Sequence, residues 1–527
     1  MDKLRYIVEK ETISSLVFVF DTNCVPFWLL DILDSICEQY SDSTIQCVIV
    51  DAAKKKNALE DRFRNLFFTP FIIIEKLIFR QKLQSMAKCR LNQMTQKYSN
   101  FQCLEERSMA SFQSQSSKDA VVISFVKLVA DRLSCNAVYE FPGELTTHGK
   151  AGVLTFFYNW RYLKRVFRVK KVTANEEEFV WDHRFQTLSY GLDKNIGYLK
   201  AAVKQSIITL WRSKYRTSKP AKEIHLSHQK WASVPLFVYW MGHILGRLKR
   251  KAIKTIFHKR WGLILIPRNR GSQSIPKVLL PKGKDGRADP FIIEEDNKKH
   301  LFFETIEASS RKGYLETAEL NGRPELHTIR KIVKEGFHLS YPHVFKKNDE
   351  WWMIPESSAD KSLRLYKSAA FPHQWEYQGN IVAGERLLDC TPFWQDGIWW
   401  IFTIIKTADD AGSYDQLYLF YTSDLLLKPW YPHPQNPIVT DSASARPAGK
   451  LFWRDGLLIR PSQDCYTDYG AAIRLNRIVK LTKTDYEEEC IQVITPASLN
   501  VNATGVHTYN HSKSYEVLDG MFNTSRM

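Results

Sequence analysis

The stretch SYPHVFKKNDEWWMIPES, residues 340–357, contains a proline, an apolar run, a polar turn and a second apolar run. Three further stretches have the same order: ADPFIIEEDNKKHLFFE from residue 288, DCTPFWQDGIWWIFT from residue 389 and SARPAGKLFWRDGLLIRPSQD from residue 444. Their prolines, at positions 290, 342, 392 and 447, are separated by 52, 50 and 55 residues. A repeat of about fifty residues indicates an array of one supersecondary unit, and it therefore decides the fold of this half of the chain.

The turns inside these stretches indicate hairpins. KKND, WQDG and WRDG each supply Asn, Asp or Gly residues that tolerate positive φ. Short strand pairs at this spacing predict a β-propeller with four-stranded blades. Four units contain a proline, and we expect a fifth blade in which residues 260–271 (RWGLILIPRNRG) join the C-terminal HTYNHSKSYEVLDGMF, so that the ring closes without sheet edges. The prediction is an all-β, five-bladed propeller over residues 259–527.

The N-terminal part has a different pattern. Within residues 1–215, the β-rich runs SLVFVFD, STIQCVIVD and DAVVISFV alternate with helical patterns. This alternation is typical of a parallel sheet covered by helices. We expect a multidomain chain with an N-terminal α/β domain of Rossmann type (1–215), a basic helical connector (216–258) and the propeller.

The chain has a formal net charge of +17, with 74 Lys plus Arg against 57 Asp plus Glu, which favours polyanionic partners. Seven of the basic residues lie in RLKRKAIKTIFHKR (247–260), directly after the apolar VPLFVYWMGHIL. Residues 232–260 are therefore a candidate for contact with an anionic membrane surface, and the alternative is an interdomain helix with a solvated basic face. No nucleic-acid-binding module accompanies the charge, so no specific nucleic acid partner is expected.

The nine cysteines include no Cys-x-x-Cys pair and no Cys/His set with zinc spacing, so no metal is expected. The charged N-terminus lacks the apolar core of a signal peptide, and no segment reaches the length of a membrane span. We expect a cytoplasmic protein, with a peripheral position at the inner membrane as the further option.

Polar residues beside the four prolines would converge at the mouth of the channel if each unit begins the innermost strand of a blade. The set comprises Asp289, Tyr341, His343, Asp389 and Arg446, with Glu304, Glu356, Arg460, Gln463 and Asp464 from the partner strands. Such a set can bind a polyhydroxylated or anionic ligand, and paired carboxylates can act as acid and base on a glycosidic bond.

We assign catalytic roles to Asp289, Asp389 and Glu356 and ligand-binding roles to the others. The alternative is that these residues satisfy strand ends and tie blades together through buried ion pairs. The tryptophans of the second strands, at positions 351, 352, 399 and 400, are expected to pack between blades rather than against a sugar.

The run from about residue 261 to 521 resembles the propeller domain at the N-terminus of plant glucosamine inositolphosphorylceramide transferases, which also occurs in many bacterial proteins. The resemblance rests on LSYPHVFKKNDEWWMIPES, DCTPFWQDGIWWIFT, LLIRPSQDCYTDYGAAIRLNRI and GVHTYNHSKSYEVLDG. It implies a fold similar to the five-bladed propellers of arabinanase-like glycoside hydrolases, whose three acidic residues come from different blades. Asp289 resembles the first of these residues. Tyr341 and His343 stand where the second Asp is expected, which speaks against simple hydrolysis.

The N-terminal half resembles the formyltransferase-like domain that precedes this propeller in bacterial proteins. SLVFVFDTNCVPFWLLDILDSI and DAVVISFVKLVADRLSCNAVYEFPGEL carry the resemblance. It implies formyl-tetrahydrofolate as a cofactor and an Asn, His and Asp that activate the amine and stabilise the oxyanion. The matching place here, YEFPGELTTHGKAG, has no His-Pro pair and offers Glu144 and His148 as the nearby candidates. The resemblance therefore implies a degenerate domain that has lost or changed this chemistry.

These observations lead to one main hypothesis and two alternatives. The main hypothesis is a carbohydrate-active protein of bacterial surface-glycan biosynthesis, which binds or transfers a sugar, nucleotide sugar or lipid-linked sugar in the propeller channel. Whether it is an enzyme, a glycosyl- or formyl-type transferase, stays open. The alternatives are a non-catalytic scaffold at the inner membrane that binds a glycan or a partner, and, behind it, a glycoside hydrolase.

Overall fold

The computed structural model describes residues 15–20, 24–41, 44–50, 88–90, 93–106, 121–124, 138–140, 167–172, 177–183, 199–200, 203–204, 206–208, 245, 257–268, 275–281, 283–295, 298–320, 326–406, 414–426, 429–466 and 468–525. The chain divides into two compact units, one within residues 10–248 and the other within residues 249–527. Most of the expected basic connector, together with Glu144 and His148, lies outside the described residues. No helix among the described residues is long and apolar enough to span a bilayer.

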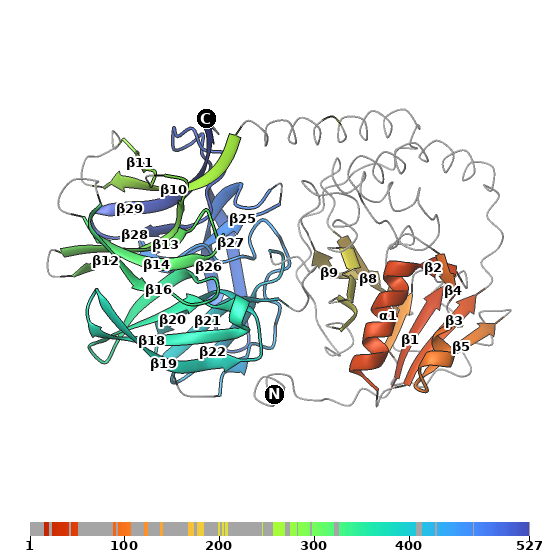
Figure 1. Ribbon diagram of the computed structural model, residues 1–527. Helices are drawn as coiled ribbons and strands as arrows, with labels where there is room; N and C mark the ends of the chain where they lie inside the picture. The colour runs from red at the N-terminus through yellow and green to blue at the C-terminus, as the bar shows by residue number, and fades with distance from the viewer. Residues whose placement is uncertain are drawn as a thin grey trace. The chain divides into compact units, whose positions relative to one another are not determined.

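The N-terminal unit contains a seven-stranded sheet in the order β5-β3-β1-β6-β7-β8-β9 (Figure 1). The strands are β1 (Ser15–Phe20), β3 (Thr44–Val50), β5 (Phe101–Glu106), β6 (Val121–Ser124), β7 (Val138–Glu140), β8 (Phe167–Val172) and β9 (Glu177–His183). The first five are parallel, and β8 and β9 are antiparallel additions. Strand β1 is buried along Leu16–Phe20, as expected for a central parallel strand that is covered on both faces.

A short ribbon and two helices complete the described elements of this unit. The ribbon pairs β2 (Cys24–Pro26) with β4 (Lys88–Arg90). Helix α1 (Phe27–Gln39) buries Leu29, Ile32, Leu33 and Ile36, the spacing of one helical face, and α3 (Gln93–Lys97) buries Met94. The expected parallel sheet is thus present in the described residues.

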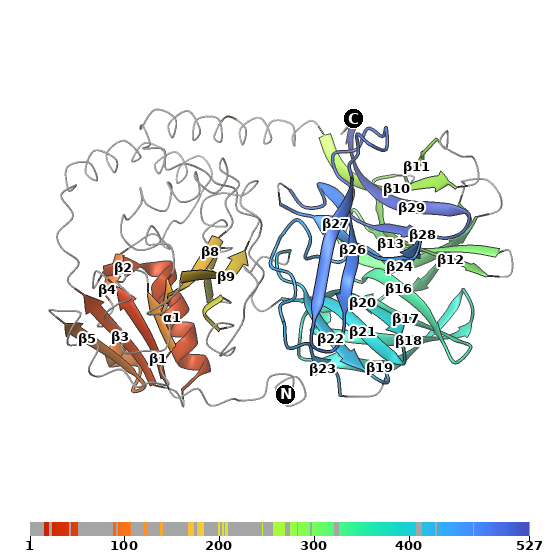
Figure 2. The same cartoon turned by 180° about the vertical axis from the view of Figure 1, so that it is seen from behind.

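The C-terminal unit is a five-bladed propeller of four-stranded antiparallel sheets (Figure 1, Figure 2). From the channel outward, blade 1 is β28 (Tyr509–His511), β29 (Tyr515–Ser525), β10 (Phe257–Pro267) and β11 (Lys277–Leu279). Blade 2 is β12 (Gly286–Glu295), β13 (Lys298–Ile306), β14 (Gly313–Glu319) and β15 (His327–Val333). Blade 3 is β16 (Ser340–Lys347), β17 (Glu350–Glu356), β18 (Ser362–Ala370) and β19 (Gln374–Ala383), with the short η5 (Ser358–Asp360) between β17 and β18.

Blade 4 is β20 (Leu387–Gln395), β21 (Ile398–Ile405), β22 (Tyr418–Thr422) and β23 (Tyr431–Pro432). Blade 5 is β24 (Phe452–Arg454), β25 (Leu457–Asp464), β26 (Ala472–Leu481) and β27 (Tyr486–Ile494). The five blades predicted from the repeat are therefore confirmed.

The ring closes as the sequence predicts. Strands β10 and β29 pair along their whole length, from Phe257 opposite Ser525 to Pro267 opposite Tyr515, and lie side by side in both views (Figure 1, Figure 2). Leu263, Ile264 and Val517 of these strands have no exposed surface. The first propeller strand is thus paired with a strand that lies about 250 residues away in the sequence.

The hairpin turns also follow the prediction. Asn348 and Asp349 of blade 3 both have positive φ, 51° and 60°, and Asp396 with Gly397 of blade 4 has 51° and 78°. Two consecutive residues with positive φ are the signature of the turns that match the right-handed twist of a hairpin.

Tryptophans of the second strands pack between neighbouring blades. Trp399 belongs to a core cluster with Phe345 and Ile354 of blade 3, whereas Trp400, one residue further and on the opposite face, packs with Ile478 and Tyr486 of blade 5. Alternation along β21 thereby provides apolar surface to both neighbours of blade 4. The expected packing role of these tryptophans is confirmed.

The inner strands of blades 2, 3 and 4 share a backbone irregularity at their channel end. The strand register shifts at Asp289, at Tyr341 and at Asp389, and the three residues have φ of 51°, 46° and 46°. Each shift is a β-bulge, which turns the local amide out of the strand ladder and re-aims a side chain. The three positions are equivalent in the fold, although Pro392 lies three residues after its bulge residue and Pro290 and Pro342 lie one residue after theirs.

Candidate functional site

Eight buried polar side chains gather at this end of the channel, and we call them the channel cluster. They are Asp289, Glu304, Glu356, Asp389, Arg446, Gln463, His507 and Asp519, and each is less than a tenth exposed. They come from all five blades or from the segments that lead into them. Five carboxyl groups thus share a small buried volume with one guanidinium and one imidazole.

The bulges explain why several carboxylates lie here. The amide of Asp289 donates to Asp519 Oδ2 at 2.8 Å, and the amide of Tyr341 donates to Asp289 Oδ2 at 3.1 Å. The amide of Asp389 donates to Glu356 Oε2 at 3.3 Å. Each carboxylate satisfies an amide of the following blade that the bulge has removed from its ladder. These acids therefore have a structural role in addition to any chemical one.

His507 and Asp519 form the most enclosed part of the cluster. The Nδ1 atom of His507 lies 2.6 Å from Asp519 Oδ2, and its Nε2 lies 3.6 Å from Asp289 Oδ1. Burial alone would lower the pKa of His507, but the charges of Asp519 and Asp289 raise it above its ordinary value. The imidazole also stacks on Trp261, with ring centroids 4.0 Å apart. The two carboxylates therefore favour the protonated form of His507.

The same three residues could hold a metal ion by distance alone, because one ligand atom from each lies within 4.8 Å of the others. However, Asp519 Oδ1 already accepts the amides of His507 and Thr508, and Thr508 donates its hydroxyl to Asp289 at 2.7 Å. Their hydrogen-bonding capacity is thus largely occupied within the protein. A resident metal is not required to explain the arrangement.

Asp389 is held by two side chains of blade 5. Arg446 Nε donates to Asp389 Oδ2 at 2.6 Å, and Gln463 Nε2 donates to the same oxygen at 3.1 Å. Burial raises the pKa of Asp389 to about 7, although Arg446 opposes the rise. Arg446 also lies 3.7 Å from Glu356 and faces the rings of Tyr414 and Tyr469. Asp389 can therefore gain or lose a proton near neutral pH.

Glu304 has the most unusual environment of the five carboxyl groups. Burial, together with the charges of Asp289 and Glu356, raises its pKa well above the ordinary value, which favours the protonated side chain. Its Oε1 has no hydrogen-bond partner of good geometry among the described residues. A Cβ on Gly313 would lie 2.0 Å from this oxygen, so only glycine leaves room for the carboxyl group.

His338 connects Glu304 with a more exposed region. Its Nε2 lies 3.2 Å from Glu304 Oε1, and its Nδ1 accepts the amide of Gly313 at 2.8 Å. Because Nδ1 accepts, a neutral ring must carry its proton on Nε2, next to the carboxyl group. Burial lowers the pKa of His338, while its side chain is still 38% exposed. The ring therefore presents its N–H group to Glu304, and its second nitrogen is occupied by the Gly313 amide.

Tyr341 occupies the middle of the channel and has no exposed surface. Its hydroxyl lies 2.8 Å from Thr391 Oγ1 and accepts the amide of Gly449 at 2.7 Å. A Cβ on Gly449, where φ is 140°, would lie 2.0 Å from the Tyr509 carbonyl oxygen, so glycine is needed for this approach. The tyrosine thus joins blades 3, 4 and 5 below the cluster.

Four of the residues predicted for the site do not join the cluster, and Tyr341, described above, is the first of them. Arg460 pairs with Glu488 of the same blade at 2.6 Å, and Asp464 pairs with Arg474 at 2.8 Å. His343 is buried further along β16, on the other side of Tyr341 from the acids. Asp289, Glu304, Glu356, Asp389, Arg446 and Gln463 do converge as expected.

Sequence reasoning missed three neighbours: His507, Asp519 and His338. His507 and Asp519 stand in GVHTYNHSKSYEVLDG, where the fifth unit has no proline to mark the start of its inner strand. Asp519 lies on the second strand of its blade, as Glu304 and Glu356 do, so alignment of second strands could have found it. His338 lies before β16 and has no equivalent in the repeat.

Comparison with known proteins shows what the propeller is similar to. Residues 283–521 match the family model of the glucosamine inositolphosphorylceramide transferase 1 N-terminal domain. Glucosamine inositolphosphorylceramide transferase 1 of Oryza sativa subsp. japonica is 35% identical over 237 residues, which cover 44% of this chain and 32% of that protein. The Arabidopsis thaliana protein of the same name is 34% identical over 226 residues, 42% of this chain and 29% of that protein. The matched segments thus span about a third of the length of these curated relatives.

Among solved structures, the catalytic domain of Coprinopsis cinerea GH62 α-L-arabinofuranosidase is 12% identical with a TM-score of 0.35, over 50% of this chain and 96% of that one. Zg3597, a family 117 glycoside hydrolase of Zobellia galactanivorans, is 13% identical with a TM-score of 0.32, over 46% of this chain and 85% of that one.

The match to the family model, residues 283–521, includes every residue of the channel cluster. The cluster therefore belongs to the part of the chain that is similar to the transferase N-terminal domain.

Proposed function

We propose that the propeller binds the sugar part of a phosphorylated substrate, a nucleotide sugar or a lipid-linked sugar, in a transferase system of surface-glycan assembly. The observation that carries the proposal is the channel cluster itself, in which carboxylates and a guanidinium converge from five blades. Carboxylates accept hydrogen bonds from sugar hydroxyls, and arginine binds phosphate through planar, paired hydrogen bonds. The curated relatives are named glucosamine inositolphosphorylceramide transferases. This name combines a sugar, a phosphoryl group and a ceramide, and it supports the same substrate class.

Arg446 retains hydrogen-bonding capacity for such a ligand. Its Nε donates to Asp389, and its Nη2 lies 3.7 Å from Glu356, beyond hydrogen-bonding distance. No described residue accepts a hydrogen bond from its other N–H groups. Two aromatic rings, of Tyr414 and Tyr469, flank the guanidinium and provide apolar faces against which a sugar ring could pack.

The pKa shifts of two carboxyl groups in the cluster support acid and base roles in a transfer reaction. The raised pKa of Glu304 favours its protonated form, which can donate to a departing oxygen, while Asp389, with a pKa of about 7, can accept a proton from an attacking hydroxyl. Two carboxyl groups whose environments place them in different protonation states are the usual arrangement for acid and base roles.

The second candidate is a non-catalytic scaffold that recognises a glycan or a partner. It is favoured by the bulge amides, because Asp289, Glu356 and Asp519 already perform a structural task that needs no substrate. The short length of the match to the relatives also allows the propeller to be a recognition domain beside a separate transferase domain. Glycoside hydrolysis ranks third, because Tyr341 occupies the bulge position equivalent to Asp289 and Asp389.

For the N-terminal unit we propose a doubly wound, formyltransferase-like domain. Its parallel strands have the order β5-β3-β1-β6-β7, which in chain order is 3-2-1-4-5, the order of doubly wound sheets that bind ligands where the order reverses. This proposal includes formyl-tetrahydrofolate as a cofactor. It also includes contact of residues 232–260 with a membrane and a cytoplasmic position at the inner membrane.

The first experiment is a thermal-shift screen of the full chain with nucleotide sugars, sugar phosphates and formyl-tetrahydrofolate. A ligand at one hundred times its Kd should stabilise the binding unit by about 2.7 kcal/mol. Arg446→Met should abolish the shift given by a sugar nucleotide or sugar phosphate. No shift with any sugar ligand would remove the support for a sugar site in the channel.

A matched pair of variants then separates enzyme from scaffold. Glu304→Gln copies the shape and neutrality of the protonated acid but cannot donate its proton, so an enzyme should keep ligand binding and lose turnover, followed by NMR of the released nucleotide. Glu316→Gln, a buried glutamate of the same blade that bonds to Thr305 outside the cluster, should change neither. A wild-type chain that binds the sugar without any turnover would favour the scaffold.

A further inference from the structure

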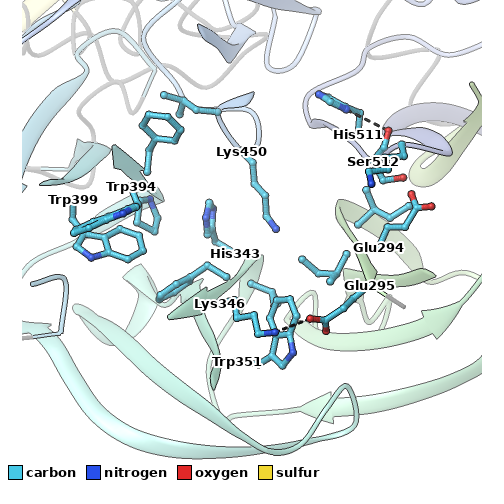
Figure 3. A pocket seen from close by; sticks show the side chains of 18 residues that line it. Glu294, Glu295, His343, Lys346, Trp351, Trp394, Trp399, Lys450, His511 and Ser512 are labelled. Carbon is cyan, nitrogen blue, oxygen red and sulfur yellow. Dashed lines mark hydrogen bonds and ion pairs between the residues drawn. The ribbon is translucent and has the colours of Figure 1, made fainter. Parts of the chain in front are cut away.

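The propeller has a second concave site, on the far side of Tyr341 from the channel cluster. A cavity of about 720 Å³ opens there, lined from β12, β16, β20 and β28 and by the segment before β24 (Figure 3). No residue of the channel cluster lines it. Tyr341 bonds to Thr391 and Gly449, the sequence neighbours of Pro392 and Lys450 in the cavity wall. The two sites therefore lie at opposite ends of the channel.

Lys450 extends into the middle of this cavity (Figure 3). No described residue forms an ion pair or hydrogen bond with its Nζ, which lies 6.0 Å from the ring centroid of Phe291. Of the other charged side chains in the cavity wall, Lys346 donates to Glu295 at 2.7 Å, Glu294 accepts the Ser514 hydroxyl, and Lys513 is a second cation. Burial lowers the pKa of Lys450 to about 7 because a counter-charge is missing.

His343 lies beside Lys450 and is likewise without a partner. Its side chain is 2% exposed, and its buried Nδ1 has no hydrogen-bond partner among the described residues. Burial, with the charge of Lys450, lowers the pKa of His343 well below its ordinary value, so the ring is neutral and can donate one hydrogen bond. A buried polar atom without a partner is costly, and a bound group that pairs with it would remove that cost.

The third feature is an aromatic wall. Trp394 is 49% exposed and leans on the buried Trp399, with ring centroids 5.3 Å apart (Figure 3). An indole face held in place by a second indole is a suitable platform for a planar or sugar ring. It lies in the same cavity as the unpaired cation.

We propose that this cavity binds a monoanion carried on a ring, with the anionic group at Lys450 and His343 and the ring against Trp394. Lys450 is the cation that extends into the middle of the cavity, and a carboxylate is the simplest anionic group that can pair with it. An aromatic acid and a sugar acid share this chemistry. The proposal does not depend on the function of the channel cluster, because it concerns the opposite end of the channel.

Calorimetric titration of the full chain with benzoate and with D-glucuronate tests this inference and separates the two ring types. One of these acids should bind at least tenfold more tightly than its uncharged counterpart, benzyl alcohol or D-glucose. Lys450→Met and Trp394→Ala should each weaken binding tenfold or more. Lys298→Met, an exposed lysine outside the cavity, should leave binding within twofold of the wild type.

The variants should fold, since Lys450→Met replaces a buried amine by an apolar chain of similar length and Trp394 is half exposed; melting temperatures check this. Equal affinity of each acid and its uncharged counterpart would overturn the proposal. So would acid binding that survives both Lys450→Met and Trp394→Ala, because the anion would then bind elsewhere.

Discussion

Replacing Asp389 by asparagine should remove a pH-dependent loss of stability from the propeller. In the folded state the pKa of this carboxyl group is raised from 3.8 to about 7. The folded protein therefore holds a proton that the unfolded chain has lost between these two pH values, and its stability falls as the pH rises through this window. The side-chain amide of the Asp389→Asn variant does not titrate, and its oxygen can still accept the bonds from Arg446 and Gln463.

The magnitude follows from the size of the shift. A rise of about 3 pKa units corresponds to about 4 kcal/mol of folding free energy, at 1.36 kcal/mol per unit, and the slope inside the window is about 1.4 kcal/mol per pH unit. Between pH 5 and pH 8 the stability of Asp389→Asn relative to the wild type should thus increase by about 3 kcal/mol. Asp289 and Glu304 are present in both proteins, but the charge of Asp389 contributes to the raised pKa of each, so the difference also contains the loss of that repulsion.

Urea unfolding at each pH, followed by a brief thiol-labelling pulse at one fixed pH and mass spectrometry of Cys390, gives the required free energies. Cys390 is 1% exposed in the core between blades 3 and 4, so its labelling reports propeller unfolding in the full chain. Asp349→Asn, at a hairpin turn where the side chain is 99% exposed, is the matched control and should run parallel to the wild type. Parallel curves for Asp389→Asn and the wild type would refute the reasoning, because the carboxyl group would then not titrate between pH 5 and pH 8.

Three further substitutions test the structural roles assigned above. Arg460→Met should destabilise the propeller by about 3–5 kcal/mol, because it leaves Glu488, whose side chain is only 10% exposed, without its cation. Sugar binding should be unchanged, and a loss of binding at unchanged stability would show that Arg460 belongs to the site. Gly449→Ala should cost about 1–3 kcal/mol or more through overlap with the Tyr509 carbonyl, measured by urea unfolding, and a neutral result would mean that the segment can shift. Tyr341→Phe should cost about 1–3 kcal/mol because the Gly449 amide loses its acceptor, whereas an unchanged melting temperature would show that water replaces the hydroxyl.

The architecture of the propeller was largely predictable because proline and turn residues mark local backbone geometry. Pro290, Pro342 and Pro392 each follow a bulge within a few residues, and that bulge places an acid or a tyrosine at the channel. The closure between residues 257–267 and 515–525 followed from the need to leave no open sheet edge.

The detailed site was less predictable because side-chain direction changes with every residue along a strand. Gln463 reaches Asp389, whereas its neighbour Asp464 and also Arg460 pair within their own blade. Alternation along β25 sets this difference, and the repeat alone could not fix its phase. His507 was missed because its unit has no proline, although the residue, like Arg446, lies before the inner strand of its blade.

The pairing of β10 with β29 has a consequence during protein synthesis. Ribosomes add roughly 5–20 residues per second, so β10 emerges about 10–50 s before the strand that completes its blade. During this interval Leu263, Ile264 and Leu265, all fully buried in the finished ring, belong to an apolar edge without its final neighbour. The nascent propeller is therefore most prone to aggregation just before its last strand is released, and chaperone dependence should be greatest for chains stalled in that interval.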